Sequence, residues 1–160
     1  MQKDVAIVVI NFNSHKYTLE CVEALNKKIS SKVSYEIIVV DNGSEDEDFR
    51  ILKENLPKSN LTFIRSSTNH GYSVGLDLGA KAGTAKHFFF LNNDCIIEED
   101  AIEILHEYYR THKDAGVIGG QIITPEGGLE RSFNYFPTLS MKLLGHEILN
   151  LFERGRYPYR

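Results

Sequence analysis

The sequence predicts an α/β fold in which a mostly parallel sheet carries helices on both faces. Short runs of Val, Ile and Phe recur along the chain without polar interruption, which is typical of strands covered on both sides. Stretches with a helical spacing of apolar residues alternate with these runs, and this alternation favours parallel strands joined by helical crossovers. The hydrophobic content of 42% suits one globular domain over residues 1–160.

The first half of the chain contains three apolar runs separated by two helical stretches. Helix starts are indicated by Ser14, a favoured N-cap residue, and by the acidic residues 45–48, which are favourable at a helix N-terminus. Val22, Leu25 and Ile29 share one face of the first helix. The expected elements are strands at 5–10, 35–40 and 61–65, a helix from Ser14 to about Lys28 and a second helix from Glu45.

Residues 69–83 carry glycine at regular four-residue intervals, at Gly71, Gly75, Gly79 and Gly83. In a helix these positions would share one side, and each interior glycine costs about 0.5–1 kcal/mol relative to alanine. This cost needs a compensating reason. The sequence leaves two reasons open, which are the close approach of a bound ligand and the close packing of the helix on the sheet.

A strand at residues 88–91 opens the second half, and its apolar side chains predict that it is buried. The acidic residues 98–100 indicate a further helix start, with Ile102, Leu105 and Tyr109 on the apolar face of that helix. The pattern then becomes less regular, although the order of strands and helices up to this point is Rossmann-like. We expect a short strand or turn at 116–124, a turn at 125–128, a strand at 129–135 and a less regular helical tail over 137–160.

Clusters of Asn, Asp, Ser and Gly follow four of the expected elements, at residues 11–14, 41–44, 69–71 and 92–94. One such cluster would be an ordinary turn signal. The carboxyl ends of parallel strands meet at one edge of a sheet, so these four clusters predict a shared binding cleft. Asp41 can accept hydrogen bonds from a base or ribose there. Asp94 is the type of oxygen ligand that Mg²⁺ and Mn²⁺ prefer.

Composition and motifs exclude several classes of function. A net charge of −4 argues against a nucleic-acid surface. The glycine fingerprint of dinucleotide sites, the phosphate-binding Gly-Lys-Ser/Thr pattern and a nucleophile elbow are all missing. Cys21 and Cys95 lack metal-type spacing and are interpreted as reduced thiols. With no signal peptide or membrane-length run, we expect a cytoplasmic location, in solution or peripherally at the inner face of the membrane.

The strand-end motifs resemble those of family 2 glycosyltransferases with the GT-A fold, and the rhamnosyltransferase-like branch most closely. The likeness extends over about residues 4–140 and rests on residues 8–14, 39–44, 69–75 and 91–94 in this order. The resemblance implies a nucleotide-diphosphate sugar donor, linked to UDP, dTDP or GDP, and a divalent metal, Mn or Mg. It also implies an inverting transfer to a saccharide or lipid-linked acceptor, as in polysaccharide biosynthesis.

The resemblance further implies roles for individual residues. The loop after the first strand would hold the base, and Asp41 would contact the nucleoside. Asp94 would occupy the metal and diphosphate position of an Asp-x-Asp-type motif whose first member here is Asn92, a weaker metal ligand. The implied cofactor-binding residues are Asn11, Phe12, Asn13, Asp41, Asn69, Gly71, Tyr72, Gly75, Asn92, Asn93 and Asp94, with Asp94 as the metal ligand.

The acceptor-side motifs of the family, which supply its catalytic base, have no match in this chain. We therefore expect the donor-binding domain of a longer glycosyltransferase, with weak or no transfer of its own, an unassigned catalytic base and a tendency to form homo-oligomers. The alternative is a non-catalytic nucleotide-binding or protein-interaction module. A nucleotidyltransferase is disfavoured, because residues 11–14 lack the Gly-rich, basic loop that it requires.

Overall fold

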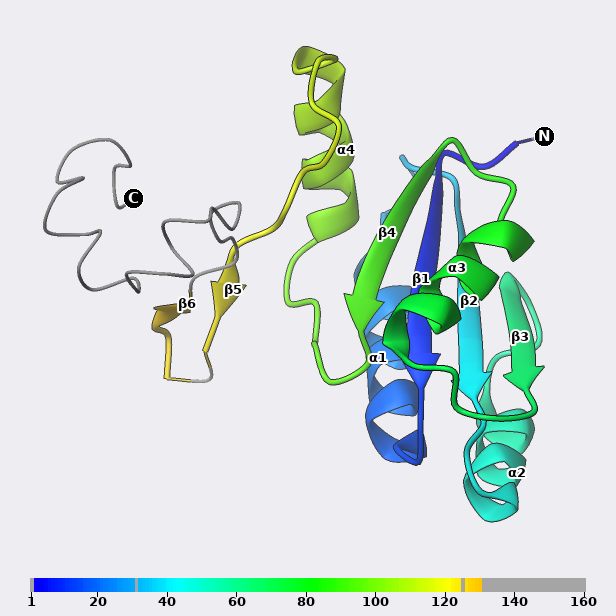
Figure 1. Cartoon of the computed structure of the whole chain (residues 1–160). Coiled ribbons are helices and arrows are strands. Elements are labelled where there is room, and N and C mark those ends of the chain that lie inside the picture. Colours follow the sequence, from blue (N-terminus) through cyan, green and yellow to red (C-terminus); the bar gives the residue numbers. More distant parts are fainter. Residues whose placement is uncertain (1, 31, 125, 131–160) are drawn as a thin grey trace, which may run out of the picture. The chain divides into compact units, whose positions relative to one another are not determined.

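In the described part of the chain, four parallel strands in the order β3-β2-β1-β4 form the main sheet (Figure 1). The structure is a computed structural model that describes residues 2–30, 32–124 and 126–130. The strands confirm the predicted apolar runs and extend slightly beyond them. They are β1 (Val5–Asn11), β2 (Tyr35–Asn42), β3 (Leu61–Ser66) and β4 (His87–Asn92).

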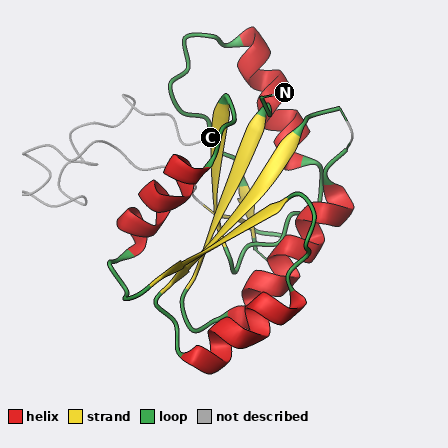
Figure 2. Ribbon diagram, turned by 90° about the vertical axis from the view of Figure 1, so that its right-hand side faces the viewer, coloured by secondary structure: helices red, strands yellow, loops and turns green. Residues whose placement is uncertain are grey.

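Helices cover both faces of this sheet, as the alternating pattern predicts (Figure 2). Acidic residues form the first turn of α2, and the Asp100 side chain caps α4 by accepting a hydrogen bond from the backbone N of Glu103 at 3.0 Å. Ser14 occupies the N-cap position of α1, but its side chain makes no capping hydrogen bond. The helices are α1 (His15–Lys28), α2 (Asp46–Asn55), α3 (Tyr72–Ala82) and α4 (Ala101–Thr111).

The sheet separates two apolar layers, because alternate side chains of a strand point to opposite faces. In β1, Ile7 and Val9 pack with residues of α1, α2 and α4, whereas Val8 and Ile10 pack with residues of α3. Every residue of β1 is buried, and a fully buried Ile or Val contributes about 1.5–3 kcal/mol to folding. These layers hold the carboxyl end of β1 between the ends of β2 and β4.

The strand β4 differs from the prediction of a fully buried strand. Phe88 and Phe90 are 38% and 49% exposed, whereas Leu91 is buried. The register places Phe88 and Phe90 beside Ala6 and Val8, on the face that α3 covers only in part. Among the described residues β4 pairs with β1 alone, so its outer side lies at the edge of the sheet.

The glycines of residues 69–83 are explained by helix–sheet packing. Gly75 and Gly79 are buried within α3, and a Cβ atom at Gly79 would collide with the side chain of Val8 and lie 3.3 Å from that of Val40. Gly71 and Gly83 cap the two ends of the helix and do not lie within it. Of the two reasons that the sequence leaves open, the structure supports close packing of the helix on the sheet.

The chain separates into two units, Met1–Ile118 and Gly119–Arg160, and the second is described by itself. Its described part is an antiparallel pair of short strands, β5 (Ile122–Ile123) and β6 (Leu129–Glu130). A turn containing Gly127 connects them and is held by a hydrogen bond from the Gly127 backbone N to the Thr124 carbonyl O at 2.8 Å.

The predictions for this second unit hold in part. The expected strand or turn at 116–124 is reduced to β5, and the expected strand at 129–135 begins as β6. Residues 131–135 and the predicted tail at 137–160 lie outside the described residues. Across the residues that the structure describes, no helix combines the length and the apolar character needed to span a membrane.

Candidate functional site

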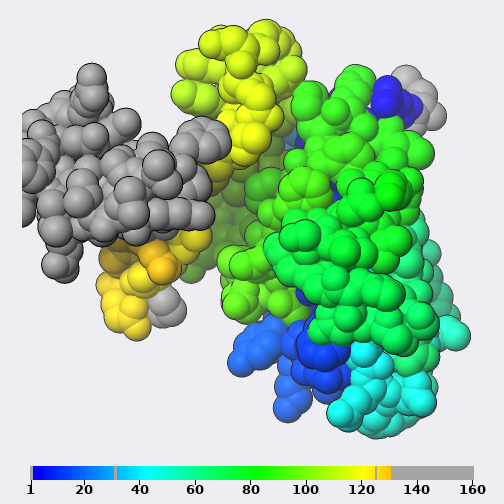
Figure 3. Space-filling model, viewed as in Figure 1, coloured from blue at the N-terminus to red at the C-terminus, as the bar shows by residue number. Residues whose placement is uncertain are grey.

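A cleft of about 400 Å³ opens at the carboxyl edge of the sheet, where β1, β2 and β4 end. Figure 3 shows this edge, where the blue residues after β1 lie beside green residues of the α3 and β4 ends. The convergence of strand-end polar groups that parallel topology predicts is therefore present. The lining residues are Ile10, Phe12, Ser14, Asn42, Asn69, Gly71, Tyr72, Asn92, Asn93 and Asp94.

Two sides of the cleft are joined by a hydrogen bond between α3 and β4. The Tyr72 hydroxyl donates to Oδ1 of Asn92 at 2.7 Å. Burial raises the pKa of Tyr72, and the nearby Cys95 and Asp94 groups raise it further, so its hydroxyl remains a donor at neutral pH. The Asn92 oxygen is thereby engaged by the protein, which leaves Asp94 as the more available oxygen ligand.

Asn93, beside Asp94, connects the end of β4 to the first helix. Its side-chain Nδ2 donates to Oγ of Ser14 at 2.7 Å and to Oγ1 of Thr18 at 2.9 Å. These two bonds hold the backbone on the N-terminal side of Asp94. The exposed Asp94 carboxylate is the one carboxylate among the described residues that line the cleft.

Asn42 lies in the predicted strand-end cluster at 41–44 and lines the cleft, although it is not among the predicted cofactor-binding residues. Its Nδ2 donates to Oδ1 of Asn69 at 3.1 Å and to the carbonyl O of Gly71 at 3.1 Å. Gly71, with φ of 88°, turns the chain into α3 in a conformation that glycine adopts without strain. The signal for Asn42 is strand alternation, which places it on the same face as Val40 and next to α3.

Asp41, in contrast, lies beneath the cleft on the other face of β2. It is fully buried, and its Oδ1 accepts a hydrogen bond from Nδ2 of Asn11 at 3.0 Å. Oδ2 has no hydrogen-bond partner among the described residues, although Nε of Arg65 lies 3.8 Å away. Asp41 is therefore not among the residues that line the cleft, whereas Asn42 beside it is, since consecutive strand residues point to opposite faces.

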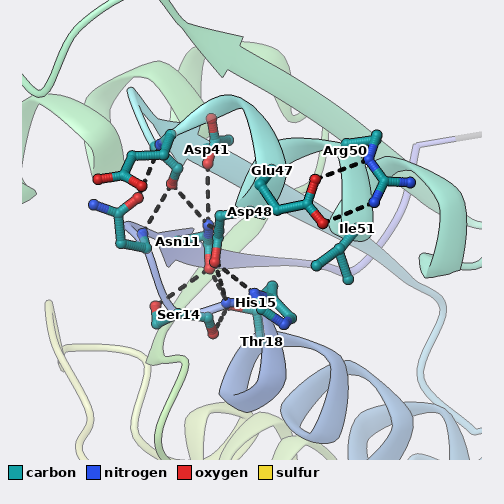
Figure 4. Close-up of polar contacts among 12 residues, drawn as sticks. Asn11, Ser14, His15, Thr18, Asp41, Glu47, Asp48, Arg50 and Ile51 are labelled. Atoms are coloured by element: carbon teal, nitrogen blue, oxygen red, sulfur yellow. Dashed lines mark hydrogen bonds and ion pairs between the residues drawn. The ribbon is translucent and has the colours of Figure 1, made fainter.

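Asn11 is the centre of the polar network beneath the cleft (Figure 4). Its Nδ2 lies 3.0 Å from Oδ1 of Asp41, 3.0 Å from Oγ of Ser44 and 2.7 Å from Oδ2 of Asp48, so two N–H groups serve three acceptors. Its Oδ1 accepts from Oγ1 of Thr18 at 2.8 Å. None of these groups lines the cleft, but Asn11 and Thr18 bond to the cleft residues Ser14 and Asn93.

The structure thus divides the predicted site residues into two groups. One group lines the cleft and contains Phe12, Asn69, Gly71, Tyr72, Asn92, Asn93 and Asp94. The other group supports the cleft from outside its lining and contains Asn11, Asn13, Asp41 and Gly75. The predicted cofactor-binding residues do not include Ile10, Ser14 and Asn42, which also line the cleft, although Ser14 and Asn42 belong to the strand-end clusters that the sequence analysis assigns to it.

Asp94, at the end of β4, is the cleft residue that could hold a divalent cation. Mg²⁺ is usually held by one or two carboxylates together with substrate phosphates and waters, and Asp94 can supply such a carboxylate. Within the described ranges, no three His, Cys, Asp or Glu side chains form a ready-made metal cluster. The substrate would therefore have to complete the coordination.

Comparison with known proteins identifies the family. The chain matches the family model described as Glycosyl transferase family 2 over residues 6–158. The chain belongs to glycosyl transferase family 2. The four-stranded parallel sheet and its helices have the GT-A architecture, and the crystal structure of Staphylococcus aureus TarS 1–349 superposes with a TM-score of 0.60 at 24% identity. That match covers 69% of this chain and 33% of the TarS chain.

Several curated glycosyltransferases are similar to this family 2 chain. Glycosyltransferase GlyG of Streptococcus pneumoniae is 29% identical over 121 residues, which are 75% of this chain and 39% of GlyG. The poly(ribitol-phosphate) β-N-acetylglucosaminyltransferase TarP of S. aureus is 27% identical over 120 residues, which are 73% of this chain and 36% of TarP. The hexosyltransferase Agl10 of Haloferax volcanii is 29% identical, with 89% of this chain and 48% of Agl10 covered. The chain thus spans less than half the length of these relatives.

Proposed function

We propose that the unit Met1–Ile118 binds a nucleotide-diphosphate sugar in the strand-end cleft and provides the donor side of glycosyl transfer. The observation that carries this proposal is the convergence of Asn42, Tyr72 and Asp94 from three separate elements on one cleft at the carboxyl edge of a family 2 sheet. Structures of TarS 1–349 with UDP and with UDP-GlcNAc support a nucleoside diphosphate as the common ligand.

The base and the diphosphate would occupy opposite parts of this cleft. Phe12, which is 46% exposed, offers an aromatic face at the β1 end, and stacking of a base on such a face contributes about 1–3 kcal/mol. Asp94 would hold a divalent cation, Mn²⁺ or Mg²⁺, at the β4 end. When bound, this cation would neutralise the leaving diphosphate.

The transfer step needs a base that deprotonates the acceptor hydroxyl, and we propose an inverting reaction. Such a base contributes about 10²–10⁴-fold to the rate. Of the described residues that line the cleft, Asp94 alone is a carboxylate, and it is assigned to the cation. We therefore expect these residues to bind the donor while transferring sugar to a saccharide or lipid-linked acceptor weakly or not at all.

Isothermal titration calorimetry tests the donor site. The protein is titrated with UDP, dTDP and GDP, with and without Mn²⁺, and the same titrations are repeated with Asp94→Asn. We expect one nucleotide to bind more tightly with Mn²⁺, and Asp94→Asn to lower that affinity about tenfold or more, because a cation ligand is lost.

Asp114→Asn is the matched control, since Asp114 is an exposed carboxylate that follows α4 and does not line the cleft. It should leave the affinity unchanged. If none of the three nucleotides binds the wild-type chain, the proposed function is wrong. The alternative of a protein-interaction module would then be favoured.

A further inference from the structure

We propose that Asp48, on α2, is a positioning residue that holds the loop between β1 and α1 in the form that receives the nucleotide. This inference rests on the proposed function. Asp48 lies outside the cleft lining and is 8% exposed. The loop that it would hold contains Phe12 and Ser14, both of which line the cleft.

The Asp48 carboxylate binds both ends of this loop (Figure 4). Its Oδ2 accepts a hydrogen bond from Nδ2 of Asn11 at 2.7 Å, at the end of β1. Its Oδ1 accepts from the backbone N of His15 at 3.0 Å, at the start of α1, and lies 2.6 Å from Nδ1 of the same residue. One side chain from a different element therefore sets the distance between the two loop ends.

Asp48 also accepts a hydrogen bond from the first turn of α1. The N-cap residue of α1 provides no side-chain acceptor for this turn. The first N–H groups of a helix have no partner within the helix and favour a negative group. Ser14 occupies the N-cap position without making that bond, and its hydroxyl instead lies 3.2 Å from Oδ1 of Asn11. Asp48 caps α1 from α2, which ties the position of one helix to that of the other.

The loop itself has a conformation that requires support. Asn13 has φ of 49°, in the left-handed region, which persists where surrounding contacts hold it. Its backbone N donates to Oγ of Ser44 at 2.9 Å, and its Oδ1 accepts from the backbone N of Glu45 at 2.9 Å. The start of α2 thus supports the middle of the loop as well, and Asp48 completes the support at the two ends.

The same network reaches the cation end of the cleft. Asn11, bound by Asp48, accepts through Oδ1 from Oγ1 of Thr18 at 2.8 Å, and Oγ1 of Thr18 accepts from Nδ2 of Asn93 at 2.9 Å. Asn93 precedes Asp94 directly. A displaced Asp48 carboxylate would therefore disturb the loop directly, and it would disturb the Asp94 backbone through the side chains of Asn11, Thr18 and Asn93.

The first part of the test needs no ligand. Amide ¹H–¹⁵N spectra of the wild-type chain and of Asp48→Asn are compared by NMR. The amide presents one acceptor oxygen and one NH₂ nitrogen, which only donates, where the carboxylate presents two acceptor oxygens, so we expect large shifts for residues 12–15 and weaker shifts for residues 93–94. Glu47→Gln is the matched control, because Glu47 is an exposed carboxylate of the same first turn that pairs with Arg50.

The second part of the test measures the affinity of each variant for a nucleotide in the presence of Mn²⁺. The nucleotide is the one among UDP, dTDP and GDP that the wild-type chain binds. If Asp48→Asn reduces the binding-competent loop population to about a tenth, the dissociation constant rises about tenfold. Asp48→Glu keeps the negative charge at the start of α1 but displaces the carboxylate. This variant replaces Asp48→Asn in both measurements if Asp48→Asn does not fold. We expect it to shift the loop amides and to weaken binding less than Asp48→Asn.

Two outcomes would overturn the inference. The first is a folded Asp48→Asn or Asp48→Glu variant whose loop amides match those of the wild type, whether or not any nucleotide binds. The second is a shifted loop with unchanged nucleotide affinity. Failure of the wild-type chain to bind any nucleotide would instead refute the proposed function, and the two failures are thus distinguishable.

Discussion

Consecutive polar residues at the strand ends serve different purposes because their side chains point to opposite faces of the sheet. Asn42 lines the cleft and holds the loop before α3, whereas the adjacent Asp41 is buried beneath it. The end of β1 shows the same division, with Phe12 in the cleft and Asn11 in the supporting network. A substitution at one of two neighbouring residues can therefore alter ligand contact or loop support separately.

The pKa of Asp48 leads to a prediction about acid stability. Burial would raise this pKa, but hydrogen bonds from the His15 backbone and side chain and from Asn11 more than offset it, so the pKa lies below its usual value. Because this pKa is lower in the folded state, ionised Asp48 stabilises the folded protein, and its contribution is complete above the unfolded-state pKa of about 3.9. That stabilisation is lost as the pH falls through the folded-state pKa.

Urea denaturation between about pH 6 and pH 3 checks this prediction. The free energy of unfolding of the wild-type chain should fall more steeply with decreasing pH than that of Asp48→Asn, which has no group to titrate at this position. Arg50 lowers the pKa of Glu47 as well, but this exposed ion pair is screened by solvent and contributes little, so Glu47→Gln should lie closer to the wild type than Asp48→Asn does. Equal slopes for the wild type and Asp48→Asn would contradict the assigned hydrogen bonds.

At the scale of elements, α3 is defined by how closely its backbone approaches the sheet. The buried face of this helix uses glycine at positions where β1 and β2 side chains leave no space. The sequence indicates the unusual glycine spacing but not its cause, because spacing alone does not show what faces the helix. The cause depends on Val8 and Val40, which are far from α3 along the chain.

Alanine substitutions within α3 test this packing. Gly79→Ala should destabilise the chain by up to about 2 kcal/mol, because overpacking costs about 1–3 kcal/mol and the gain in helix propensity offsets about 1 kcal/mol of it. Gly75→Ala is the matched control on the same helix, since its Cβ would lie 3.2 Å from the Cδ1 atom of Ile10, a contact that small adjustment can relieve. Urea denaturation of both variants measures the difference. A Gly79→Ala variant as stable as Gly75→Ala would contradict the close packing.

The elements themselves were largely predictable, and the exceptions have physical causes. Continuous apolar runs identify β1 and β2 because both of their faces are covered. The same reasoning overestimates the burial of β4, since a run of Phe cannot show that its strand lies at the edge of the described sheet. The proposed role of Asp48 could not be predicted from the sequence either, because a run of acidic residues at a helix start is typical of a solvated surface.

At the scale of the whole molecule, the parallel topology of the sheet creates the strand-end cleft. It brings the ends of β1, β2 and β4 to one edge, and this convergence is predictable from the order of strands and helices alone. Which side chains enter the cleft is not predictable to the same degree, because it depends on the strand register and on side-chain bonds between distant elements. The family assignment identifies the fold, and the geometry distinguishes the lining residues from those that support them.

We propose that a divalent cation and a nucleoside diphosphate bind together at the Asp94 end of the cleft. Mn²⁺ is paramagnetic and broadens the NMR signals of nearby amides, so titrating it into the nucleotide-bound chain locates the ion. We expect signals of residues 92–95 and of Tyr72 to broaden first, and Asp94→Asn to abolish this broadening. Broadening that is centred on the acidic residues 45–48, or that is unchanged in Asp94→Asn, would contradict a cation site at Asp94.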